Sequence, residues 1–138
     1  MLTKTNLVST LVTGLWALFG GYLLWGILGE TLLAGHELTL GLMRENPDFI
    51  HLSIGCLLAG LAFSVLYGKW ANGIYTNASG IIFGAWVAVL IGLGEGLITY
   101  STAELLDLSG TLINFGIYFV FYIIMGMLAS LIYRKVSK

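Results

Sequence analysis

Charge is what this sequence has least of. Only 9% of its 138 residues are Asp, Glu, Lys or Arg, whereas 58% are hydrophobic. That composition is too apolar for a soluble domain of this length. The single cysteine, Cys56, excludes an internal disulfide and is interpreted as a small packing residue. The chain therefore falls in the class of integral membrane proteins.

Four windows of the chain contain no charged residue at all. They are residues 5–29, 49–68, 70–94 and 108–133. Each is near or above the roughly 20 residues that a helix needs to cross the hydrocarbon core, and none alternates in polarity as a barrel strand would. We predict an all-α, integral membrane four-helix bundle that forms a single domain over residues 1–138. The helices are expected at about 7–28, 47–71, 79–102 and 111–133.

The charges separate into two groups that alternate along the chain. Five of the six basic residues lie before the first helix, between the second and third helices, or after the fourth helix. They are Lys4, Lys69, Arg134, Lys135 and Lys138. Six of the seven acids occupy the other two gaps, together with Arg44: Glu30, Glu37, Glu45, Asp48, Glu104 and Asp107. The positive-inside rule then places both termini in the cytoplasm. The first apolar run is longer than the core of a signal peptide, so we interpret it as a retained anchor.

Small residues recur every four positions in three of the helices. The third helix carries Gly80, Gly84, Ala88, Gly92 and Gly96; the second carries Cys56, Gly60, Ser64 and Gly68; the first carries Thr13, Ala17 and Gly21. Such ridges let membrane helices approach closely. We therefore predict that they are helix contact faces, and that the second and third helices are neighbours.

A short internal similarity accompanies this pattern. Gly14-Leu15-Trp16-Ala17 resembles Gly84-Ala85-Trp86-Val87, and each segment lies in the first helix of a hairpin. Two weakly related hairpins would form a parallel repeat about an axis along the membrane normal, but a match of four residues is too short to favour that arrangement.

Glu95 is the one charged residue well inside a predicted helix. An acid at membrane depth is costly and indicates a functional site. At about 100° per residue it lies near the ridge of Gly84 and Ala88 and opposite Trp86, so it should face the bundle. Asn114, Tyr118 and Ser53 are expected to line a pocket with it, as a proton relay or cation site. The alternatives are a protonated structural residue bonded to Asn114 or a tyrosine, and a residue that reaches the interface by tilt of its helix.

Other polar residues carry weaker signals. Asn46-Pro47-Asp48 is typical of a helix start, with Asn46 as the cap, and Asn72-Gly73 is typical of a helix end. His36 and Glu37 are adjacent and make a poor metal pair. The apolar segment 31–43 is long enough to lie on the membrane as a short helix.

Motifs for catalysis, phosphate binding or zinc hydrolysis do not occur in the sequence. We therefore expect no enzymatic activity, no metal, no cofactor and no nucleic-acid partner. Three basic residues at the C-terminus are too few to indicate nucleic-acid binding and instead suggest lipid headgroup contact.

Four segments give the chain a resemblance to a group of uncharacterised small four-helix bacterial membrane proteins. The segments are Trp25-Gly26-Ile27-Leu28, Met43-Arg44-Glu45-Asn46-Pro47-Asp48, Gly68-Lys69-Trp70-Ala71 and the stretch from Tyr100 to Gly110 with Leu108. The resemblance implies the architecture and a location in a bacterial inner membrane. It implies no activity.

Two functions are compatible with these features. The leading interpretation is a small multi-pass membrane protein that transports or conducts a small solute or ion through a site near Glu95, as an oligomer because four helices alone enclose little space. The alternative is a membrane partner or sensor subunit that assembles through its small-residue helix faces. An intramembrane enzyme would need a second catalytic group beside Glu95.

The predicted topology can be tested by cysteine accessibility. With an acidic outer face and cytoplasmic termini, a cysteine at Thr39 should react with an impermeant reagent added from outside, and one at Asn72 should not. The reverse labelling pattern would invert the orientation.

Overall fold

The computed structural model describes residues 2–137, which form four long helices and no strand beyond one isolated bridge. The first membrane-length helix joins α1 (Lys4–Gly21), a π-helical segment η1 (Tyr22–Gly29) and α2 (Glu30–Leu32). The second is α3 (Phe49–Ala71). The third joins α4 (Asn77–Ala88), the π-helical η2 (Val89–Glu95) and α5 (Gly96–Thr102), and the fourth is α6 (Leu108–Val136). The expected all-α, four-helix architecture is confirmed.

Helix ends follow from local side chains. The cap of α3 is Asp48, whose carboxylate accepts hydrogen bonds from the backbone N–H groups of Ile50 and His51. The prediction that Asn46 caps this helix is therefore wrong, because an ionised Asp two residues later satisfies the free N–H groups better. At the other end of α3, Asn72 and Gly73 have positive φ angles of 45° and 87°. That left-handed turn ends the helix as predicted.

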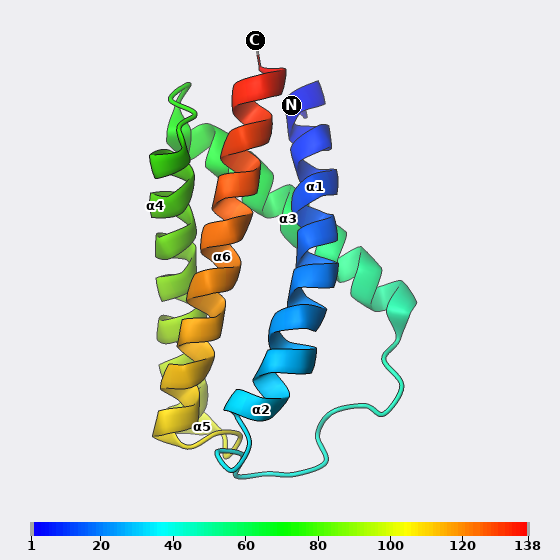
Figure 1. Ribbon diagram of the computed structural model, residues 1–138, viewed down its shortest axis with the longest axis vertical. Coiled ribbons are helices and arrows are strands. Elements are labelled where there is room, and N and C mark those ends of the chain that lie inside the picture. The colour runs from blue at the N-terminus through cyan, green and yellow to red at the C-terminus, as the bar shows by residue number, and fades with distance from the viewer. Residues whose placement is uncertain (1, 138) are drawn as a thin grey trace.

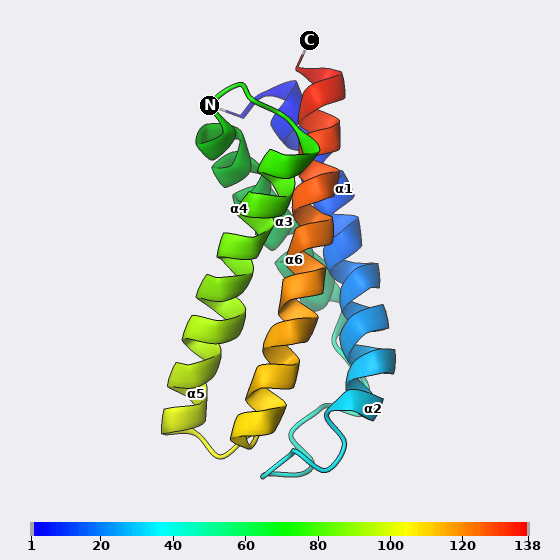
Figure 2. The ribbon, with the colours of Figure 1, turned by 60° about the vertical axis from the view of Figure 1, so that its left-hand side comes forward.

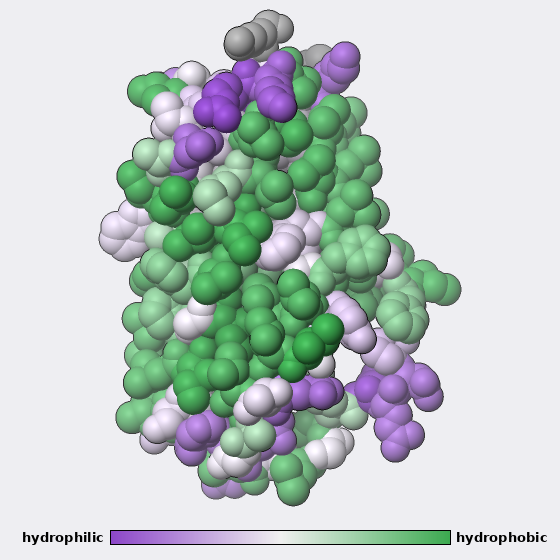
Figure 3. Space-filling model, in the orientation of Figure 1, coloured by the Kyte–Doolittle hydropathy of each residue, from purple (hydrophilic) through white to green (hydrophobic). Residues whose placement is uncertain are grey.

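Both termini lie at one end of the molecule, together with the turn after α3 (Figure 1). We call this the terminal end, and the end that carries loops 33–48 and 103–107 the opposite end. Polar residues gather at these two ends, and an apolar band lies between them (Figure 3). All four helices are long and apolar enough to cross a membrane. The protein is thus a multi-pass membrane protein whose apolar band contacts lipid.

The helices pack as two pairs, α1 with α3 and α4 with α6, and α1 and α6 join the pairs. Figures 1 and 2 both show α6 between α1 and α4, while α3 crosses behind them at a steep angle. α3 approaches α4 only near the terminal end, where Phe63 and Tyr67 contact Phe83 edge to face. The bundle is therefore open between α3 and α4 toward the opposite end.

Glycines determine these two pairings. A Cβ on Gly60 would lie 2.7 Å from the backbone N of Gly14, so α1 and α3 touch backbone to backbone. A Cβ on Gly84 would lie 2.1 Å from the carbonyl oxygen of Tyr122, and one on Gly80 2.3 Å from that of Gly126. Each ridge thus faces a helix of its own hairpin. The prediction that the second and third helices pack on each other through these ridges is wrong.

Most other ridge residues of the second and third helices also meet neighbours within the bundle. Gly92 faces the Tyr118 side chain, Gly96 faces Thr111, and Gly68 faces the Tyr133 hydroxyl. Ala88 and Ser64 are fully buried. A Cβ on Gly21 of the first helix, by contrast, would meet nothing within 4 Å, so the predicted contact face of that helix does not extend to Gly21.

Buried polar groups hold the terminal end together. The Tyr133 hydroxyl lies 2.7 Å from Asn6 Oδ1 and 2.8 Å from the Ser64 carbonyl oxygen. The Tyr67 hydroxyl lies 2.7 Å from Ser79 Oγ. These bonds join all four helices across the core, where an unsatisfied polar group would be costly. The terminal end is therefore closed.

Substitution of Gly84 by Ala tests the α4–α6 contact. Because the new methyl group would overlap the Tyr122 carbonyl, the helices must separate, and we expect a loss of about 1–3 kcal/mol in stability. Thermal unfolding in detergent measures it. Gly116→Ala is the matched control, since a Cβ there meets nothing within 4 Å and should stabilise the helix slightly. Equal stability of the two variants would contradict the close crossing.

Candidate functional site

Glu95 lies at the end of the π-helical segment η2. A π-helix closes hydrogen bonds over five residues instead of four, so each turn is wider than in an α-helix. The sequence-based projection assumed 100° per residue throughout and therefore misplaces Glu95. In the structure the residue is exposed rather than enclosed by the bundle, although it still lines a cavity beside α6. The expectation that Glu95 faces the bundle interior is corrected in this respect.

The cavity next to Glu95 has a volume of about 260 Å³. Its walls come from η2, α5, the loop after α5 and α6. They comprise Ile91, Glu95, Gly96, Thr99, Tyr100, Leu105, Leu106, Thr111, Asn114 and Tyr118. The structure thus brings together three of the four predicted site residues: Glu95, Asn114 and Tyr118.

Ser53 is the fourth, and it does not line this cavity. It lies on α3, on the half that diverges from the other helices (Figure 1). Similar depth along the chain suggested Ser53, but the steep angle of α3 removes that half of the helix from the site. The prediction for Ser53 is therefore wrong.

Asn114 is held in place by Trp25. The indole N–H of Trp25 donates to Asn114 Oδ1 over 2.8 Å, and the ring packs edge to face on Tyr118 and Phe121. This contact uses the amide oxygen, so the amide NH₂ is the part of Asn114 that remains free to donate hydrogen bonds in the cavity. Trp25 itself lies in the π-helical segment η1. Two π-helical segments, which often occur at functional sites, therefore converge on one stretch of α6.

A two-loop clip closes the cavity at the opposite end. The Leu38 N–H donates to the Leu105 carbonyl and the Asp107 N–H to the His36 carbonyl, both over 2.9 Å. His36 Nδ1 also lies 3.0 Å from both carboxylate oxygens of Asp107. Because Leu105 and Leu106 form part of the cavity wall, the clip fixes one side of the site. Segment 33–43 contributes His36 and Leu38 to this clip and is not helical, so it does not form a surface helix.

Electrostatics at the site are dominated by one unpaired acid. Among residues 2–137, the only ion pairs are His36 with Asp107 and His51 with Asp48. Within the same part of the chain, the Glu95 carboxylate has no hydrogen-bond partner, neither Asn114 nor a tyrosine. The cavity offers it hydroxyl groups from Thr99, Tyr100 and Tyr118 and the amide of Asn114. In the described chain no three His, Cys, Asp or Glu side chains gather as a metal site would require.

The path toward the terminal end is closed beneath this cavity. The backbones of α4 and α6 touch at Gly80 and Gly84, which leaves no space for a solute between them. The cavity therefore does not continue between α4 and α6 toward the terminal end.

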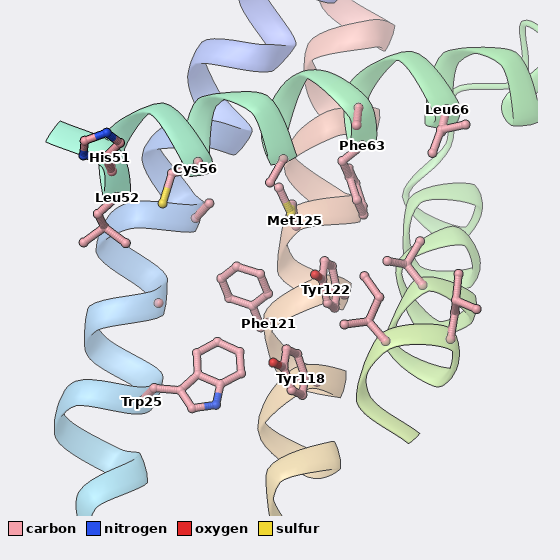
Figure 4. A pocket seen from close by; sticks show the side chains of 18 residues that line it. Trp25, His51, Leu52, Cys56, Phe63, Leu66, Tyr118, Phe121, Tyr122 and Met125 are labelled. Atoms are coloured by element: carbon pink, nitrogen blue, oxygen red, sulfur yellow. The ribbon is translucent and has the colours of Figure 1, made fainter. Parts of the chain in front are cut away.

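A second and larger hollow was not predicted. It has a volume of about 730 Å³ and lies in the gap between α3 and the other helices, among Trp25, Cys56, Phe63, Phe121 and Met125 (Figure 4). Tyr118 contributes to both hollows. The small residues Ala17, Gly21, Gly55 and Ala59 were a signal for it, since they widen the space where α1 and α3 separate.

Comparison with protein-family models, with curated proteins and with solved structures finds no match to this chain.

Acid titration tests the clip. The Gly110 backbone N–H and the His36 imidazole beside Asp107 hold the pKa of its carboxyl below the ordinary 3.8. A lowered native pKa stabilises the fold above the unfolded value and loses this contribution as pH falls through the native pKa. Asp107→Asn should therefore reduce the acid-induced loss of stability, measured by unfolding in detergent from neutral pH downward. Glu104→Gln, in the same loop, should leave the acid profile unchanged; an equal effect would refute the role of Asp107.

Proposed function

We propose that this protein binds a small cation at Glu95, with the proton as the smallest candidate, and carries it across the membrane. The observation that supports this is the unpaired Glu95 carboxylate on the wall of a cavity whose other polar groups are neutral. An intramembrane acid commonly marks an ion or proton pathway. A cation would neutralise Glu95, and hydroxyl oxygens on the cavity wall could complete its shell.

The size of the cavity limits the ligand. A cavity of about 260 Å³ has room for several water molecules. A partly hydrated metal cation or a small organic amine fits that space. A larger solute would require the two-loop clip to open, and the hydrogen bonds at Leu38 and Asp107 oppose this.

The closed contact between α4 and α6 favours a carrier over a channel. A channel needs a continuous wet path, whereas the glycine contact between α4 and α6 blocks the path from this cavity toward the terminal end. The two-loop clip lies at the other end, which the positive-inside orientation places away from the cytoplasm. A transport cycle would then require α4 and α6 to shift at the glycine contact, or a second copy of the chain to complete the path.

The alternative role, a partner or sensor subunit that assembles through small-residue faces, has less support. Gly60, Ser64, Gly68, Gly84 and Gly92 lie against neighbouring side chains or backbone inside the bundle. An assembly surface would have to use other residues.

Flux measurements with Glu95→Gln test the proposal. Liposomes that contain the wild-type protein and a pH-sensitive dye should dissipate an imposed proton gradient faster than protein-free liposomes. If the protein exchanges Na⁺ for H⁺, they should also take up Na⁺ faster when the gradient is imposed. Glu95→Gln keeps the size and hydrogen-bonding capacity of the side chain but removes its charge. We expect it to abolish flux and to leave thermal stability unchanged.

Glu104→Gln is the matched control, because Glu104 carries the same charge at the same end but does not line the cavity. It should retain flux. If the wild-type protein moves neither H⁺ nor Na⁺, or if Glu95→Gln moves them equally well, the proposal is refuted.

A further inference from the structure

The hollow between α3 and the rest of the bundle is independent of the Glu95 site in its chemistry. Of the residues at its wall, most are apolar or aromatic, and Glu95 is not among them. The hollow opens where α3 diverges from the other helices (Figure 4), and its lining is mostly apolar, so its mouth lies within the apolar band of the protein. Whatever fills it must come from the membrane.

Volume distinguishes the candidate occupants. A transmembrane helix about 10 Å wide and 30 Å long fills roughly 2,400 Å³, more than three times the 730 Å³ available. The hollow is, however, within the range of small-molecule sites, about 300–1,000 Å³. A lipid chain therefore fits it better than a helix of a partner or of a second copy.

The length of the hollow also favours a lipid chain as its occupant. On α3 the lining runs from His51 to Leu66, which is about 22 Å at a rise of 1.5 Å per residue. One leaflet of the hydrocarbon core is about 15 Å deep, and α3 is tilted, so its lining spans little more than one leaflet. The hollow thus has the reach of an acyl chain that enters from the leaflet at the opposite end.

The mouth carries a positive group without a partner. His51 and Leu52 belong both to this hollow and to a polar depression that contains Arg44, Pro47 and Asp48. The Asp48 carboxylate already accepts from His51 Nδ1 over 2.7 Å and from two backbone N–H groups. Among residues 2–137 Arg44 makes no ion pair, and it is the only Lys or Arg at this end.

From these features we infer that the hollow between α3, α1 and α6 binds an acyl chain of an anionic phospholipid, whose phosphate contacts Arg44. The apolar wall accepts the chain, and Tyr118 and Tyr122 place their hydroxyl groups toward it (Figure 4). Arginine matches phosphate geometry well. The lipid would hold α3 at its steep angle and, through Tyr118, would border the Glu95 cavity.

Native mass spectrometry of the full chain with added phosphatidylglycerol tests the inference. Wild-type protein should retain one phosphatidylglycerol and retain phosphatidylcholine less well. Ala59→Trp and Ala62→Trp would each fill the hollow from α3 and should weaken lipid retention about tenfold or more. Ile54→Trp introduces the same side chain on the same helix at a residue that is 50% exposed and outside the hollow. It should retain lipid as the wild type does.

Arg44→Gln tests the headgroup contact. Loss of one basic residue near a membrane surface should weaken phosphatidylglycerol binding about fivefold and change phosphatidylcholine binding less. Lys69→Gln, which removes a base at the terminal end, should have no such effect.

Photo-crosslinking gives a measurement that needs no variant. Phosphatidylglycerol with a diazirine in its acyl chain should crosslink at Trp25, Cys56 or Ala59 rather than on the outward faces of α1 and α3. Crosslinks restricted to those outward faces, or Ala62→Trp and Ile54→Trp with equal retention, would overturn the inference. So would a dimer that forms without lipid and is lost in Ala59→Trp, since a second copy would then be the occupant.

Discussion

Backbone contact at glycine is the constraint on which the rest of this structure depends. In lipid, apolar surface gives no drive for helices to associate, so close packing and hydrogen bonds must do so. Gly14 with Gly60, and Gly80 and Gly84 with α6, bring two helix pairs together at the shortest distance that backbones allow. Because all this close packing is within hairpins, α3 and α4 are left without a shared ridge. Their separation creates both the large hollow and the shape of the bundle.

The two helical hairpins of the chain, α1 with α3 and α4 with α6, share the same structural features. In each, the first helix contains a π-helical segment toward the opposite end, Tyr22–Gly29 in one and Val89–Glu95 in the other. In each, a glycine of the first helix touches the second. The short similarity between residues 14–17 and 84–87 lies next to these contacts. The two hairpins differ in the angle between their helices, since α6 runs along α4 whereas α3 turns away from α1 (Figure 1).

Much of the architecture could be read from the sequence, because charge-free windows and helix-stop residues such as Asn72 and Gly73 act locally. The helix that packs against each ridge could not be predicted, because a small residue at every fourth position identifies a contact face but not its partner helix. Glu95, Asn114 and Tyr118 were recognised because polarity at membrane depth is conspicuous. Ser53 was misassigned because depth alone does not encode the angle of α3. The π-helical turns, which shift Glu95 around its helix, leave no mark in residue spacing.

The tilt of α3 also gives the protein unequal widths in the two leaflets. At the terminal end hydrogen bonds among Asn6, Ser64, Tyr67, Ser79 and Tyr133 join all four helices, whereas the beginning of α3 lies apart from the other helices (Figure 1). The molecule is therefore a wedge, broader in one half of the bilayer than in the other. A wedge is accommodated most easily where the membrane bends toward its narrow side.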